Sequence, residues 1–161
     1  MKKSDLYKSI RDIAKAGITD LEFVDLQKGQ FKRIKENQPV PLPALLIEFR
    51  GGSFSEMARN SQMGDVTIAI YFYLDLVTDS FDGAESEEET IELLDRQDDV
   101  YRVFQGQSCE LFSKLIRTNE EPPQYGERYI MFRTDFSTNV KEILEPVLAT
   151  IQKPIIKLKM I

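Results

Sequence analysis

The sequence predicts an α+β fold: a mostly antiparallel sheet of four to five strands with two main helices packed on one face. Two segments, 65–75 and 129–136, alternate strictly between apolar residues and a more polar set, as half-buried strands do. Two other segments, 4–17 and 86–106, repeat apolar residues at the spacing of a helix. Because strands lie on either side of the second helix in the sequence, a sheet covered by helices on one face is favoured.

Each predicted helix has signals at its ends. Ser4 is the expected N-cap of the first helix, and Gly17 is expected to stop it. Ser86 followed by Glu89 forms a capping-box pattern before the second helix, which should end at Gly106. The apolar residues expected to face the sheet are Leu6, Ile10, Ile13 and Ala14 in the first helix and Ile91, Leu94, Val100, Tyr101 and Phe104 in the second.

The alternating segment 65–75 is the clearest strand in the sequence. Its aliphatic residues share one side, so Tyr71 and Tyr73 must lie on the opposite face. Only one face of the sheet needs a helical cover, and we expect the tyrosine face to be open to solvent or to a partner. The five strands are predicted at 21–26, 44–49, 65–75, 111–116 and 129–136.

The polar segments between these elements are predicted to be loops. The first, 27–38, is basic and is interpreted as a loop or hairpin tip. The second, 53–64, follows a turn at Gly51–Gly52 and has Phe54 and Met57 as its only large apolar residues. A third loop contains Pro122–Pro123.

The length of 161 residues suits one domain with one core. We expect an α+β domain at 1–139 and a C-terminal extension at 140–161. That extension is predicted to form a short helix and then an edge strand or arm. Its last part, 155–161, is apolar and β-prone, so it would either add a strand to a neighbouring subunit or fold back locally.

Composition removes several classes of function. The net charge is −6, whereas phosphate binding needs a face dominated by Lys and Arg, so we predict no nucleic-acid partner. Histidine is absent, which removes the commonest acid–base group and metal ligand, so we predict no enzyme activity and no cofactor. The single Cys109 excludes an internal disulfide, fits a reducing compartment and is interpreted as a half-buried thiol.

The same sequence gives no sign of a membrane partner. It contains no apolar run of about 18 residues, which a spanning helix needs. The start, with Lys2 and Lys3, turns at once into a helical pattern rather than the apolar stretch of a secretory signal. We therefore expect a protein that works inside the cell, against other chains.

The acidic second helix leaves one enzymatic alternative open. Glu88, Glu92 and Asp95 continue one another along the helix, and nucleotide hydrolases bind Mg²⁺ through helical carboxylates at such spacings. Those sites need carboxylates from two helices, and the sequence has one acidic helix. A solvated helix face, acidic at the end where the helix dipole favours acids, is the simpler interpretation.

Basic and acidic residues are concentrated in different segments. Lys28, Lys32, Arg33 and Lys35 lie in the first loop, and the acidic residues gather between 85 and 99. A head-to-tail ring brings different patches of identical subunits together, so the basic patch of one subunit would align on the acidic patch of the next.

The order of the predicted elements resembles a known family. An amphipathic helix precedes the proline-led strand Pro41–Phe49 (PLPALLIEF), then come a polar loop, the alternating strand Asp65–Leu74, a second amphipathic helix and the aromatic-rich strand Tyr129–Phe136. Over residues 4 to 138 this pattern resembles the tail-completion and tail-terminator proteins of long-tailed bacteriophages, which join head and tail.

The resemblance implies a virion structural subunit without catalytic residues. It would form a homo-oligomeric, commonly hexameric, ring that caps the tail tube and meets the head–tail connector, after assembly in the cytoplasm of the bacterial host. The alternative without the resemblance is an intracellular α+β domain that binds an unknown partner. The residues expected at the interfaces are Lys28, Lys32, Arg33, Phe54, Met57, Arg59, Tyr71, Tyr73, Glu88 and Glu92.

Overall fold

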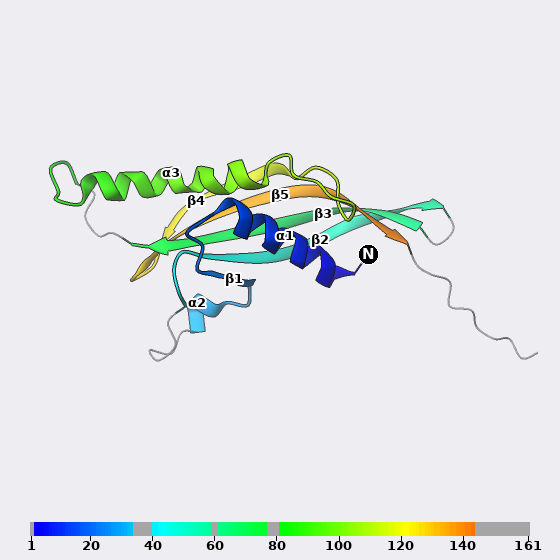
Figure 1. The fold of residues 1–161 in the computed structure, drawn as a ribbon, viewed down its shortest axis with the longest axis horizontal. Helices are drawn as coiled ribbons and strands as arrows, with labels where there is room; N and C mark the ends of the chain where they lie inside the picture. The colour runs from blue at the N-terminus through cyan, green and yellow to red at the C-terminus, as the bar shows by residue number, and fades with distance from the viewer. Residues whose placement is uncertain (1, 34–39, 59–60, 77–80, 144–161) are drawn as a thin grey trace, which may run out of the picture.

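The fold is built on one five-stranded sheet (Figure 1). A computed structural model describes residues 2–33, 40–58, 61–76 and 81–143. The strands lie in the order β1-β2-β3-β5-β4, with β1 parallel to β2 and every other pair antiparallel. The elements are α1 (Lys3–Gly17), β1 (Phe23–Leu26), α2 (Gln30–Arg33), β2 (Ala44–Ala58), β3 (Ser61–Asp75), α3 (Glu87–Phe104), β4 (Ile116–Tyr125) and β5 (Tyr129–Ile143). The predicted α+β class is confirmed.

The two long helices cover one face of the sheet, as predicted. Phe72 on β3 lies directly opposite Phe132 on β5, and Ile68 lies opposite Phe136. These side chains are almost completely buried and form one core with residues of both α1 and α3. The helical residues of that core are Leu6, Ile10, Ala14, Val100 and Phe104.

The helix boundaries differ from the prediction by small amounts. Helix α1 begins at Lys3, so Ser4 lies inside it and Lys2 holds the N-cap position. It ends at Gly17 as expected. Helix α3 begins after Ser86, also as expected, and ends at Phe104, close to the predicted stop.

The predicted core stripe of α3 is wrong in its first half. The side chains of Ile91 and Leu94 are 51% and 49% exposed. Instead, Leu93, Val100 and Phe104 face the core, because positions 7 and 11 residues after Leu93 return to its side of the helix. The sequence offered apolar residues on both sides of α3, and periodicity alone did not decide which side packs.

The segment 53–64 is not a loop, and the strand before it does not stop at Gly51–Gly52. Strand β2 continues to Ala58 and pairs with β3 from Ser61 onward, with a register shift between Arg50 and Ser53. We call residues 51–58 and 61–67 the arm. Figure 1 shows the arm extending beyond the helices, with the end of β5 beside it. Gly52 allows the close approach there, because a Cβ at this position would collide with the carbonyl oxygen of Asp65.

Strand β4 is also displaced from its predicted position. The prediction of a strand at 111–116 is wrong, and Phe112 makes only isolated bridges to Cys109 and Val140. The prediction of a loop at Pro122–Pro123 is wrong as well, because both prolines lie within β4. Strand β4 is at the edge of the sheet and shifts register there, and an edge strand tolerates proline because one side needs no backbone donor. Cys109 is exposed rather than half-buried.

The remaining predictions fall partly outside the described residues. The segment 27–38 contains the short helix α2, and its residues 34–39 are not described. Strand β5 passes the domain boundary expected at 139 and includes Glu142 and Ile143, where a helix was expected to begin. Residues 144–161, the rest of the predicted extension, lie outside the described part of the chain.

Candidate interaction surfaces

The face of the sheet opposite the long helices carries a network of charged residues centred on Arg133 of β5. Its guanidinium donates two hydrogen bonds to Asp135, at 2.9 and 2.7 Å, and a third to Glu121 of β4. The side chains of Arg133 and Asp135 are only 12% and 8% exposed. A buried charge needs a partner of opposite charge, and Arg133 and Asp135 are partners of each other.

The network continues across the sheet onto β3 and β2. The Tyr71 hydroxyl donates to Glu48 at 2.7 Å and lies 3.5 Å from Nη2 of Arg50. Arg50 also approaches Asp135 at 3.8 Å and Glu48 at 3.4 Å. We call the set Glu48, Arg50, Tyr71, Glu121, Arg133 and Asp135 the polar belt. It ties four strands together and contains three acids against two bases.

The belt changes the ionisation of its tyrosine. Burial raises the pKa of Tyr71, and the carboxylate of Glu48 raises it further because the hydroxyl must keep its proton to donate. Burial likewise raises the pKa of Tyr73, while the hydrogen bond from Gln27 acts in the opposite direction. Both tyrosines therefore favour the neutral form in the folded protein.

Tyr71 and Tyr73 do share the face opposite the aliphatic core, but only part of that face is open. Phe31 of α2 stacks on Tyr73, with ring centres 3.8 Å apart and planes 7° from parallel. Tyr129 packs edge-on against both rings, and Tyr73 is 5% exposed. The expectation of an open face is therefore wrong at Tyr73, because α2 covers it.

A hollow of about 420 Å³ lies between this aromatic cluster and β4. Its lining includes Phe31 and Tyr129 on the side of the cluster, Tyr125 on β4, and the ion pair of Arg133 with Glu121. The ion pair neutralises its own charges. The hollow therefore offers aromatic surface and amide groups rather than a strong charge.

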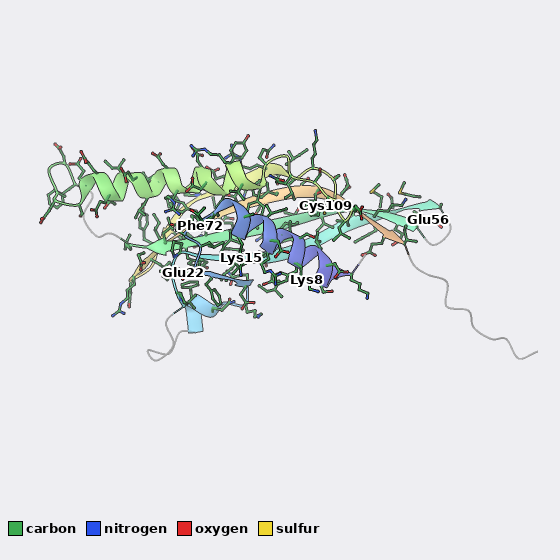
Figure 2. All side chains as sticks on the ribbon, viewed as in Figure 1. Lys8, Lys15, Glu22, Glu56, Phe72 and Cys109 are labelled. Atoms are coloured by element: carbon green, nitrogen blue, oxygen red, sulfur yellow. The ribbon has the colours of Figure 1, made fainter. Side chains whose placement is uncertain are left out.

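Exposed apolar side chains lie on both faces of the arm. Phe54 and Met57 on β2 are 48% and 55% exposed, and Ile143, at the end of β5, is 61% exposed. Ile143 pairs with Ser61, so the end of β5 lies at the tip of the arm. Figure 2 shows Glu56 near that tip, far along the molecule from Phe72 in the core. Phe54 shares the face of its partner Gly64, which is the face of the aliphatic core, whereas Ile143 shares the opposite face with its partner Ser61. Several exposed apolar residues on one extension make the arm a candidate for contact with another chain.

A second group of exposed apolar residues lies on α3 and the turn before it. Phe81 is 67% exposed, and Ile91 and Leu94 are each about half exposed. Figure 1 places the first turns of α3 at the end of the molecule opposite the arm. The two apolar groups therefore lie at opposite ends of the molecule.

The predicted acidic residues lie on the same part of α3. Glu88, Glu92 and Asp95 are exposed along the helix. Within the described residues, no set of three or more Asp, Glu or Cys side chains is arranged to hold a metal ion. None of the described helices is both long enough and apolar enough to cross a membrane.

Of the predicted basic cluster, the structure describes the side chain of Lys28 alone. Lys28 contacts both carboxylate oxygens of Asp25 at 3.0 Å. Burial alone would raise the pKa of Asp25, but hydrogen bonds from Lys28, the Leu26 amide and Gln30 outweigh burial and lower that pKa. Lys32 and Arg33 belong to α2 but their side chains are not described, and Arg59 lies outside the described residues.

Sequence reasoning missed the centre of the polar belt. The alternation at 129–136 puts Arg133 and Asp135 on the face opposite Phe132, but it does not predict that the two side chains pair. The signal was present, because opposite charges two residues apart on one strand share a face. Phe31 carried no such signal, since its contact with Tyr73 joins segments far apart in the sequence.

No protein-family model matches this chain, and comparison with curated proteins finds no match either. Function is therefore inferred from the surfaces described above.

Replacing Arg133 by methionine should destabilise the fold by about 3 kcal/mol, because Asp135 would keep a buried charge that is offset by the more distant Arg50 and by a long hydrogen bond from Asn119. The double variant Arg133→Met/Asp135→Leu removes both charges and should recover most of that loss. Urea denaturation of the single and double variants measures the difference. A double variant no more stable than Arg133→Met would contradict this account of the belt.

The raised pKa of Tyr71 predicts a loss of stability at alkaline pH. The unfolded chain releases the tyrosine proton near pH 10, while the folded protein holds it to higher pH. The contribution of Tyr71 to the free energy of unfolding is therefore complete below about pH 10, and it is lost as the pH rises through the raised pKa of the folded protein. Tyr71→Phe should lose less stability over that range than the wild type, and the exposed Tyr125→Phe should behave like the wild type. The measurement is the free energy of unfolding at several pH values above about 9. If that free energy falls equally with pH in all three proteins, the raised pKa of Tyr71 is disproved.

Proposed function

We propose that the protein is a structural subunit that assembles with copies of itself into a closed ring and completes a bacteriophage or prophage tail at the head–tail junction. The observation that carries the proposal is the pair of exposed apolar groups, one on the arm and one on α3, at opposite ends of the molecule.

Two different surfaces at opposite ends of the molecule suit a head-to-tail contact. Such a contact is heterologous, because one patch of a subunit meets a different patch of the next. Repeated contacts of this kind close into a ring when the rotation between neighbours is a whole fraction of a turn, and form a filament otherwise. A tail terminator needs the closed form.

The arm supports a joining role through its shape. Residues 51–58 are exposed throughout, and the strands of the arm continue β2 and β3 of the core, with register shifts in β2 between Arg50 and Ser53 and between Glu56 and Ala58. An extension of paired strands can carry Phe54 and Met57 to a neighbour while the core stays folded.

The tail assignment is supported by the order of elements. Helix α1, strands β2 and β3, helix α3 and strand β5 follow one another in the order on which the resemblance to tail-completion and tail-terminator proteins is based, although paired strands of the arm stand where that order has a polar loop. The proposed partners are other copies of this chain, the tail-tube protein and the head–tail connector. Neighbouring genes for a tail tube, a tape measure or a portal would support this part of the proposal, and their absence would favour an interaction domain with another partner.

Assembly can be tested by sedimentation velocity and native mass spectrometry over a range of protein concentrations. We expect one discrete closed oligomer, and we expect Phe54→Asp/Met57→Asp to shift it to the monomer because a buried carboxylate at a contact is costly. Ile116→Asp is a matched control, since Ile116 is similarly exposed, at 54%, but lies on β4.

A wild-type protein that stays monomeric at all concentrations, at low and high salt, and after addition of a tail-tube protein would contradict the ring. If Ile116→Asp and the arm variant disrupt the oligomer equally, the claim that the arm makes the contact between copies is contradicted.

A further inference from the structure

The exposed side of α3 combines apolar residues with a high density of negative charge. We call Phe81, Ile91 and Leu94, with the acidic residues around them, the α3 outer surface. Residues 81–99 contain nine acidic residues and one arginine, a net charge of −8, so the other residues of the chain sum to +2. Arg96 already contacts Asp20 and Asp99, at 3.0 and 2.7 Å.

An occupant of this surface must therefore be both apolar and basic. Ile91 and Leu94, each about half exposed, would be covered by apolar side chains. The surrounding carboxylates would be matched by cations, which also orient the incoming segment.

One segment of the chain has this composition. Residues 152–161 contain three lysines, five large apolar residues and no acidic residue. The basic segment at 27–38 is a weaker match, because Lys28 is paired with Asp25 and Phe31 is stacked on Tyr73. The segment 152–161 lies outside the described residues, and β5 leads to it from the tip of the arm.

The length of the chain argues against docking within one copy. Strand β5 has 15 residues and covers about 50 Å; it begins at the end of the molecule where α3 begins (Figure 1) and ends with Ile143 at the arm. Residues 144–151 can span at most about 30 Å when fully extended. Because α3 runs back toward the arm by about 1.5 Å per residue, Asp99 lies nearer to Ile143 than the first turns of α3 do, but Ile91 and Leu94 of the same copy remain beyond the start of the segment 152–161. A neighbour can present the whole α3 outer surface at the arm.

We infer that residues 152–161 of one copy dock on the α3 outer surface of the next copy, with lysines against the carboxylates and apolar side chains over Ile91 and Leu94. This inference rests on the proposed ring and names the contact that would close it. It also predicts that salt weakens assembly, because exposed charge pairs are screened.

A charge exchange between full-length variants tests the contact. The first variant, Lys153→Glu/Lys157→Glu/Lys159→Glu, makes the segment acidic. The second, Glu88→Lys/Glu92→Lys/Asp95→Lys, makes the helix surface basic at three exposed positions. The control, Lys8→Glu/Lys15→Glu/Lys114→Glu, makes the same change of charge at exposed lysines elsewhere. Circular dichroism checks that every variant is folded.

Each of the first two variants alone should assemble at least tenfold more weakly than the wild type, because like charges would meet at every contact. An equimolar mixture of the two should recover assembly to within about threefold, since each kind of contact in an alternating ring then joins opposite charges. One chain that carries both sets of changes should also assemble, and the control should assemble like the wild type.

Three results would overturn the inference. Assembly of both variants at the wild-type level would leave the ring standing but remove this contact. Weak assembly without recovery in the mixture would show that the charges do not act across a contact between copies. A monomeric wild type would contradict the proposed ring itself, and this contact with it.

Discussion

The pairing of β3 with β5 fixes which side chains reach each face of the sheet, and most of the molecule depends on it. The two strands are in register along their full 15-residue length, which puts Phe72 opposite Phe132 and Tyr71 opposite Arg133. A slip of one residue would turn Arg133 toward α1 and α3 and leave Phe132 on the polar face. The cost of a buried, unpaired guanidinium amounts to several kcal/mol, which is comparable to the stability of a small domain.

The same sheet is longer than the helices that cover it. Strands β2, β3 and β5 each have 15 residues and cover about 50 Å, whereas α1, with 15 residues, is about 22 Å long and α3, with 18, about 27 Å. Neither helix alone spans the sheet, and as they are placed the two leave the arm uncovered (Figure 1). The arm is the uncovered part, and the exposed Phe54 and Met57 follow from this mismatch.

Sequence patterns predicted the parts of the fold in which one residue type repeats. The alternation at 65–75 and 129–136 gave the central strands and their faces, and Gly17 gave the end of α1. The arm was missed because residues 53–64 are mostly polar, so their strand conformation comes from backbone pairing with β3 and β5 rather than from an apolar period. At Pro122–Pro123 the turn signal was misleading, since an edge strand accepts residues that a central strand does not.

The candidate surfaces were predictable to a similar degree. Tyr71, Phe54 and Met57 could be named from the sequence, but the cover that Phe31 gives Tyr73 depends on where α2 folds.

The most direct test of the central claim, that the uncovered arm joins one copy to another, is hydrogen–deuterium exchange of the wild-type protein at high and at low concentration. The amides of 51–58 and of the first turns of α3 should gain protection at high concentration, while those around Phe72 stay unchanged. Equal exchange of the arm at both concentrations, in a sample shown to be oligomeric at the higher one, would contradict that claim.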